Sequence, residues 1–442
     1  MRVRHTLAMG CRAAENKNPT TPAERAAGIP GRHALRSLNF FMADMQSGIG
    51  PFIGVFLLAH GWQSGWIGSV MTIGSIAGVI MTAPAGAWVD SSRHKRWLVV
   101  IPGFFSIAAS AIILVWQSFW PVALSQVATA IAGAAVGPAV NGITLGMFKQ
   151  AGFNRQLGIN QAYNHAGNAV GAGLSGYLGW RLGLPAVLWL AVAFGAASVA
   201  SALAIPKKSI DDRAARGMRD GAKADERAQG LSILLKCKPL LILAASLALF
   251  HLGNGAMLPL YGLAVVTAKQ GDPATIVAAT IVVAQATMVL ASLVAMRMSA
   301  SRGLWLAVFI SFLTLPIRGL IAATVIKSWG VVPVQILDGI GAGLQSVAVP
   351  ALVARILNGT GRINVGQGAA MTVQGAGSAL SPAIGGWIAQ WQGYRAAFIA
   401  LGLFAVGAIV VWLTCADLYK PAIAQTSRLK PLARPKTSRR PT

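Results

Sequence analysis

Two carboxylates inside long apolar runs are the residues best suited to carry chemistry in this 442-residue chain. Asp44 lies in an apolar run at about residues 36–59, and Asp338 lies in another at about 329–357. A charged side chain in hydrocarbon costs about 3 kcal/mol or more, so such residues face protein or a water-filled cavity. We therefore expect these two carboxylates to carry a proton or to bind a cationic group.

Asp338 has a basic residue at a similar depth. It lies about nine residues from one end of its run, and Arg318 lies about eight residues from the same end of the run 304–326. Two interpretations stay open: the pair separates when a proton or substrate binds, or it is a static ion pair that fixes two helices. We favour the functional role for Asp338 and the static role for Arg318. Gln335 and Gln345 extend the polar face of Asp338 at helical spacing and are assigned to the same cavity.

A second candidate site combines Asp44 with His165, in the run 158–180. The two lie about eight and seven residues from the same end of their runs. Histidine changes charge near neutral pH and burial can bring carboxylates into that range, so this pair is our candidate proton relay. The other polar positions assigned to a substrate cavity are Gln46, Asn164, Asn168, His251 and Asn254. The alternative for the asparagines and for His251 is hydrogen bonding between helices, worth about 1 kcal/mol or less each.

Membrane helices must hold these side chains in place. The chain is 55% hydrophobic and only 11% charged, which leaves too few polar residues to coat a soluble globule. Each apolar run is long enough to cross about 30 Å of hydrocarbon as a helix. The runs are about 36–59, 64–89, 97–116, 119–148, 158–180, 183–205, 238–266, 272–296, 304–326, 329–357, 365–390 and 393–415. The sequence therefore predicts an all-α integral membrane protein with 12 transmembrane helices.

The distribution of positive charge predicts the orientation. The formal net charge is +25, and all but five of the 37 Lys and Arg residues lie in segments on one side of the predicted helices. By the positive-inside rule that side is cytoplasmic, which explains the charge without nucleic acid as a partner. The predicted parts are a disordered basic cytoplasmic tail at 1–35, a bundle at 36–205, a charged cytoplasmic linker at 206–237, a second bundle at 238–415 and a basic tail at 416–442. Both termini are then cytoplasmic, and the cell (inner) membrane is the expected location.

The two predicted bundles repeat one another. The clearest match pairs a glycine-rich stretch of the fifth predicted helix with one in the eleventh, at a shift of 210 residues. Small residues at this spacing let helix backbones approach closely, so we assign them to helix packing. They are Gly167, Gly171 and Gly176 in the first half and Gly377, Pro382, Gly385 and Gly386 in the second. Two six-helix bundles related as pseudo-repeats are therefore predicted.

A charged turn follows the second predicted helix, and its pattern is that of a known family. It contains Gly86, an aspartate four residues later at Asp90, and the basic pair Lys95 and Arg96. This turn resembles the loop signature of the major facilitator superfamily. The match is partial, since Ser91 stands where a basic residue is usual in that family.

The resemblance covers about residues 36–415 and implies more than the turn. Proteins of that superfamily have two six-helix bundles, move solutes by alternating access and work as monomers. It also implies that the turn gates the inward mouth, and that the first and tenth helices, which carry Asp44 and Asp338, line a central cavity. These implications agree with the cost of burying the two carboxylates in lipid.

Other functional classes lack support in the sequence. The three cysteines are scattered without metal-ligand spacing, and no nucleophile and base arrangement stands out, so we expect neither enzyme activity, nor a metal, nor another cofactor. A phosphate-binding loop ending in Lys-Ser or Lys-Thr is missing, so ATP is not the expected energy source. The prediction is a secondary active transporter of a small organic solute, proton-coupled, with export favoured over uptake. The alternatives are an uptake symporter or uniporter, and a membrane sensor that binds solute without moving it.

Overall fold

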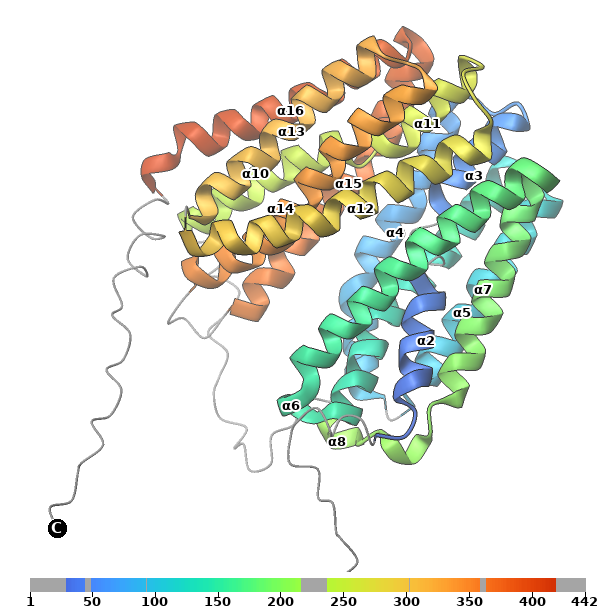
Figure 1. Cartoon of the computed structure of the whole chain (residues 1–442), viewed down its shortest axis with the longest axis vertical. Helices are drawn as coiled ribbons and strands as arrows, with labels where there is room; N and C mark the ends of the chain where they lie inside the picture. Colours follow the sequence, from blue (N-terminus) through green and yellow to red (C-terminus); the bar gives the residue numbers. More distant parts are fainter. Residues whose placement is uncertain are drawn as a thin grey trace, which may run out of the picture.

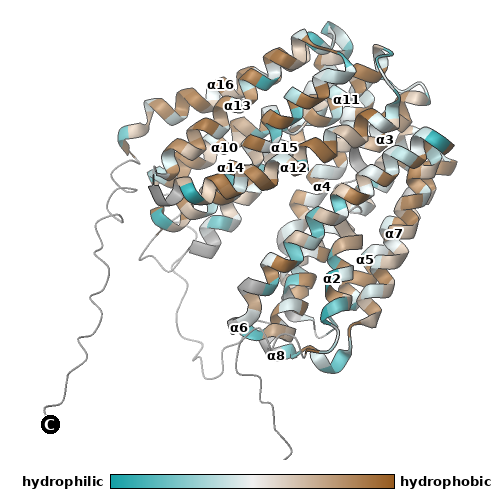
Figure 2. Ribbon diagram, in the orientation of Figure 1, coloured by the Kyte–Doolittle hydropathy of each residue, from teal (hydrophilic) through white to brown (hydrophobic). Residues whose placement is uncertain are grey.

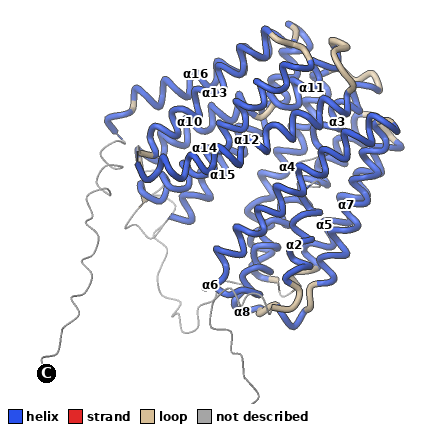
Figure 3. The backbone as a smooth tube through the Cα atoms, in the orientation of Figure 1, coloured by secondary structure: helices blue, strands red, loops and turns tan. Residues whose placement is uncertain are grey.

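The computed structural model describes residues 29–43, 49–92, 94–215, 237–301, 303–357 and 363–418. All regular secondary structure in these ranges is helical (Figure 3). Asp44, Gln46, most of the predicted linker and most of both predicted tails lie outside the described residues.

The first half of the chain forms one bundle, at the lower right of Figure 1. Its elements are α2 (Arg32–Ala43), α3 (Ile49–Ala59), α4 (Ser64–Ser91), α5 (Trp97–Val115), α6 (Phe119–Leu182), α7 (Leu184–Ala204), the 3₁₀ turn η2 (Lys207–Ser209) and α8 (Asp212–Ala215). The second half forms the other bundle. Its elements are α10 (Lys238–Asn254), α11 (Met257–Thr267), α12 (Pro273–Ser301), α13 (Leu304–Thr324), η3 (Ser328–Gly330), α14 (Val331–Ile356), α15 (Ile363–Gln392) and α16 (Tyr394–Thr414).

The helices are suited to a lipid environment. Nine helical segments of the described chain are long and apolar enough to cross a membrane. The other predicted spans are α2 with α3, the second part of α6, and α15. Helices α2 and α3 have only 12 and 11 residues. In the second part of α6 and in α15, polar residues and glycines lower the hydropathy. Together they agree with the predicted twelve. Large apolar side chains such as Trp189 of α7 and Leu403 of α16 are exposed, as lipid-facing residues are. Figure 2 shows apolar residues along the helices of both bundles.

Four helix boundaries differ from the prediction, and one of them is the end of α12, which lies at Ser301 and not at about 296. The first helix begins at Arg32, four residues early, because Leu35 is fully buried and belongs to the core. The fourth and fifth helices join in α6. Within α6 Lys149 alone departs from helical geometry (φ 55°, ψ 179°), so the two predicted helices are separated by a bend at one residue and not by a loop. The seventh helix is divided into α10 and α11 at Gly255 and Ala256.

The start of the predicted linker belongs to the first bundle. The backbone N–H of Asp211 donates to the carbonyl of Gly146 (3.2 Å), and Ala215 is buried. The Asp211 side chain also pairs with Lys149, at the bend of α6. Residues 210–215 are therefore packed against α6, and the predicted linker from 216 to 236 lies outside the described residues.

Contacts between the bundles gather at one end of the molecule, which we name the closed end. There α3 meets α11, α4 meets α15, and the outer part of α6 meets α12. Thr72 accepts a hydrogen bond from the backbone of Ala383 (2.9 Å), and Trp387 donates to Ser69 (3.0 Å). From this end the bundles diverge toward α8 and the start of α10, the open end (Figure 1).

Two turns at the closed end carry the pseudo-repeat. Gly183 and Gly393 have backbone φ angles of 87° and 86°, values that residues other than glycine rarely adopt. They precede α7 and α16 and are separated by the repeat shift of 210 residues. The same backbone conformation therefore starts the last helix of each bundle.

We predict that Gly386→Ala weakens the closed end. A Cβ atom on Gly386 would overlap the carbonyl oxygen of Ser64 in α4, so the helices must separate. Overpacking of this kind lowers the free energy of unfolding by about 1–3 kcal/mol, measurable by denaturant unfolding in micelles. Gly368→Ala on the same helix is the control, because a Cβ there meets no atom within 4 Å and alanine favours the helix. Equal effects of the two changes would contradict the packing role of Gly386.

Candidate functional site

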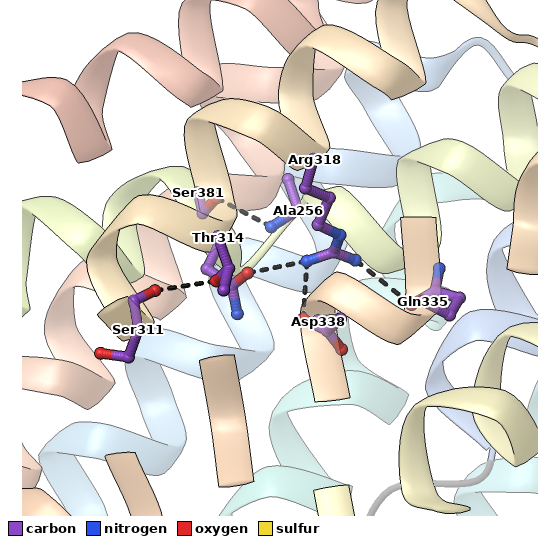
Figure 4. A network of polar contacts seen from close by, with 8 residues as sticks. Ala256, Ser311, Thr314, Arg318, Gln335, Asp338 and Ser381 are labelled. Carbon is purple, nitrogen blue, oxygen red and sulfur yellow. Dashed lines mark hydrogen bonds and ion pairs between the residues drawn. The ribbon is translucent and has the colours of Figure 1, made fainter. Parts of the chain in front are cut away.

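The guanidinium of Arg318 is the centre of a buried polar network in the second bundle. Its Nη1 donates to Asp338 Oδ1 at 2.6 Å and to Asn254 Oδ1 at 2.8 Å, and its Nη2 donates to Gln335 Oε1 at 3.3 Å. Figure 4 shows Arg318 reaching Asp338 and Gln335 from the neighbouring helix. The side chain of Arg318 is 1% exposed and that of Asp338 15%. The ion pair thus joins α13 to α14, the pairing that their similar depth predicts.

A break in the seventh helix places Asn254 in this network. Gly255 follows it against the carbonyl of Ser378, where an added Cβ would lie at only 2.6 Å. The next backbone N–H, that of Ala256, donates to the buried hydroxyl of Ser381 at 2.8 Å (Figure 4). Because α15 supplies an acceptor for a donor that the broken helix leaves unpaired, Asn254 can end α10 beside Arg318.

Glycines bring α14 close enough to complete the network. A Cβ on Gly339 would lie 2.6 Å from the carbonyl of Ala284, and one on Gly343 would lie 2.5 Å from that of Met288, both in α12. A Cβ on Gly341 would lie 2.6 Å from the side-chain hydroxyl of Thr314, in α13. Close packing of α14 against the backbone of α12 and against Thr314 therefore sets the position of Asp338.

A cavity of about 320 Å³ opens from the network toward the open end. Asn254 belongs to both the network and the cavity wall, and His251 and Gln345 lie beside it with His251 Nε2 at 3.2 Å from Gln345 Oε1. The lining residues are Phe250, His251, Asn254, Ala342, Gln345, Ser346, Val349, Pro350, Val353, Gln367, Ala370, Met371 and Gln374. The volume is at the lower end of the range for small-molecule sites.

The asparagines of the fifth predicted helix mainly join helices of the first bundle. Asn160 donates to Thr144 at 2.9 Å, across the bend in α6. Asn164 donates to the carbonyl of Asn39 in α2 at 3.4 Å, and Asn168 lies 3.5 Å from Asn164. These contacts match the structural alternative more closely than a substrate site.

His165 makes a contact between the bundles. Its Nδ1 lies 3.1 Å from Oε1 of Gln285, in α12. Asp44, its predicted relay partner, lies outside the described residues, as does Gln46 of the predicted cavity. His165 is therefore placed where the first bundle meets the second.

The charged turn after α4 binds the ends of two helices. The buried Lys95 donates to the carbonyl of Val89 at 2.6 Å, at the end of α4. Arg96 donates to the carbonyl of Ile205 at 2.6 Å, just after α7. Positive groups suit helix C-termini, so both interactions stabilise the turn. An added Cβ on Gly86 would meet no atom within 4 Å, and nothing is described for the side chain of Asp90.

The small residues of the repeated stretch lie at two kinds of interface. Within bundles, Gly167 lies against Phe40, Gly377 against Ala248 and Gly385 against Ala256, while Gly171 is buried. Between bundles, Gly176 lies against Ala278, the carbonyl of Pro382 against Gly68, and Gly386 against Ser64.

Four polar residues that take part in the site or in contacts between the bundles were not predicted from the sequence. Gln285 contacts His165, Ser381 supports the break after Asn254, and Gln367 and Gln374 line the cavity. An amide inside the apolar run of α12 was a usable signal for Gln285. The other three lie in α15, whose many small and polar residues hide individual positions.

The amino-acid sequence matches one known protein family and two related transporters. Residues 37–364 match the family model described as Major Facilitator Superfamily. Two uncharacterised MFS-type transporters, from two strains of Mycobacterium tuberculosis, are 36% identical over 390 residues, which cover 87% of this chain and 93% of theirs.

Two solved structures resemble the fold. The nucleoside transporter NupG aligns with a TM-score of 0.70 at 16% identity, over 88% of this chain and 99% of its own. A bacterial homologue of the human lysosomal transporter Spinster, in an inward-facing and unoccupied conformation, aligns with a TM-score of 0.66 at 14% identity, over 91% of this chain and 98% of its own. At these identities the likeness concerns the fold.

Proposed function

Because the chain belongs to the major facilitator superfamily, we propose that it is a secondary active transporter that exports a small organic solute in exchange for protons. Transport follows alternating access, in which one bundle rocks against the other about a site near the middle of the membrane. No ATP is consumed, and the protein works as a monomer in the inner membrane.

The buried pair of Arg318 and Asp338 is the observation that supports proton coupling most. An ionised carboxylate inside a membrane protein is costly to keep, and its pairing with Arg318 stabilises it. Asn254 connects the pair to the cavity wall, so a bound solute can compete for the same hydrogen bonds. Protonation of Asp338 and binding of solute are thereby linked through one arginine. Asp44 and His165 are the proposed second proton site, in the first bundle.

The open end faces the cytoplasm in this proposal. Its basic segments include the turn with Lys95 and Arg96 and the stretch around Lys207, in accord with the positive-inside rule. The conformation is then inward-facing, with both termini cytoplasmic. The bonds from Trp387 to Ser69 and from His165 to Gln285 must break when the molecule opens outward.

Purified protein in sealed proteoliposomes with an internal pH dye tests the proposal. A library of small solutes is added outside, and a solute-dependent change of internal pH is expected for the parent protein and is expected to be lost in Asp44→Asn. The sign of the pH change separates exchange with protons from co-transport, which would mean uptake. Flux of a bound solute without any pH change would contradict proton coupling, and binding without flux would contradict transport.

A further inference from the structure

The hydrogen bonds around Arg318 constrain the chemistry of the solute. A guanidinium carries only donors, so each group that it touches must present an oxygen. Asn254 and Gln335 do so with their amide oxygens. The amide nitrogens of both residues therefore point away from Arg318. This orientation follows from the chemistry of arginine, which offers no acceptor to an amide N–H.

Unused donors remain around the network and the cavity. Among the described residues, Arg318 Nε, Gln335 Nε2 and Gln345 Nε2 are buried without a hydrogen-bond partner. Gln345 is 6% exposed and lines the cavity, with its oxygen directed at His251. All three orphaned atoms are N–H donors. A buried donor without an acceptor costs about 1–3 kcal/mol. Of the three residues only Gln345 lines the cavity, so a ligand that brings an acceptor to its amide recovers this energy.

The cavity also disfavours net charge. The thirteen described residues that line it include no Lys, Arg, Asp or Glu. The nearest ions in the described network, Arg318 and Asp338, neutralise each other at 2.6 Å. Much of the remaining wall is apolar, with Phe250, Val349 and Val353 among its residues. An ionic solute would lose its hydration in such a site without gaining a counter-charge.

We propose that the solute is an uncharged molecule with an apolar body, and that the amide groups of Asn254 and Gln345 select it by donating hydrogen bonds to its carbonyl-type acceptor oxygens. This inference rests on the proposed function for the site and adds the class of solute. Asn254 then has two roles: its amide oxygen accepts the hydrogen bond from Arg318, and its amide nitrogen donates to the solute. Solute recognition and the ion pair therefore share one side chain.

Matched pairs of a ketone and a hydrocarbon on the same apolar body provide probes for this selection. Acetophenone and ethylbenzene differ by exchange of a carbonyl for a methylene group, and so do 1-indanone and indane. Binding is measured by titration calorimetry with the full-length protein in micelles, without any gradient and with empty micelles as the reference. The carbonyl member of a pair should bind about tenfold more tightly or better, because a methylene group leaves the amide donors without an acceptor. 4-Acetylbenzoate and tetraphenylphosphonium serve as the anionic and cationic comparators.

Two isosteric variants test the named residues. Asn254→Asp keeps the oxygen on Arg318 and removes the donor, and Gln345→Glu keeps the oxygen near His251 and removes its donor. Both changes should abolish the preference for the carbonyl member. Gln392→Glu is the control for the chemical change, because Gln392 is exposed at the end of α15 and is not among the residues that line the cavity. It should retain the preference.

Several results would overturn the inference. They are tighter binding of either charged comparator than of both ketones, a preference for the hydrocarbon members, no binding of either ketone at millimolar concentration, and an unchanged preference in both variants. These results are separate from those of the transport assay. Selective binding without proton-linked flux would leave the inference standing and refute the proposed function, whereas flux of an ionic solute would do the reverse.

Discussion

In Asp338→Asn, solute accumulation driven by a pH gradient is expected to vanish, while exchange of solute across the membrane continues. Asparagine cannot take up or release a proton near neutral pH, so the variant loses the proposed coupling site. The accumulation ratio in proteoliposomes should fall to about 1, the value without coupling between proton and solute. Exchange of labelled for unlabelled solute, measured without a gradient, needs no net proton movement and should persist. A merely structural role of Asp338 would impair both processes together.

Two further variants keep this result interpretable. Asparagine at position 338 leaves Arg318 buried without its counter-charge, so the single variant can lose stability. Arg318→Gln combined with Asp338→Asn removes the proton site and the charge together, and it should also exchange without accumulating. Asp272→Asn is the control for the chemical change, because Asp272 is exposed at the start of α12 and asparagine can also accept the bond from Thr275. Normal pH-driven accumulation by either Asp338 variant would exclude this carboxylate from coupling.

The sequence predicts the ion pair because depth can be counted along a helix. Arg318 and Asp338 lie at similar distances from the same turn, and helices rise by a fixed 1.5 Å per residue. Depth does not tell which faces of two helices meet. The contacts of Arg318 with Asn254 and Gln335 depend on how α10, α13 and α14 are rotated, which only their packing decides.

The break in the seventh helix shows a second limit. Glycine at 255 and proline at 259 both weaken a helix, but they do not fix where it breaks. The hydroxyl of Ser381, 125 residues away, accepts the freed N–H of Ala256 and so determines the position. Local propensity permits the break, and a distant side chain locates it.

Contacts between the bundles were the hardest to predict. The sequence pairs His165 with Asp44 by depth, and Asp44 lies outside the described residues. The partner that the structure describes for His165 is Gln285 of the other bundle. That contact depends on which state of the alternating cycle is present, because contacts between the described parts of the two bundles gather at the closed end here. A sequence encodes more than one arrangement of two bundles, so a pattern along one helix cannot select among them.

Arg318→Ala is expected to lower the free energy of unfolding by about 3–5 kcal/mol, because it leaves the carboxylate of Asp338 without its cation. Asp338→Ala should have a comparable cost, since it leaves the fully buried guanidinium unpaired. The combined change Arg318→Ala with Asp338→Ala removes both charges. It should be more stable than either single variant by about 2 kcal/mol or more.

Denaturant unfolding of all four proteins in the same micelles completes this double-mutant cycle. Arg395→Ala, at the exposed start of α16, controls for the loss of an arginine and should change stability by about 0.5 kcal/mol or less. Additive costs in the cycle would mean that the two side chains do not stabilise one another. A coupled cycle together with retained proton-linked accumulation in the combined variant would instead assign the pair a purely structural role. Only a coupled cycle with lost accumulation fits a pair that both holds α13 to α14 and carries the proton.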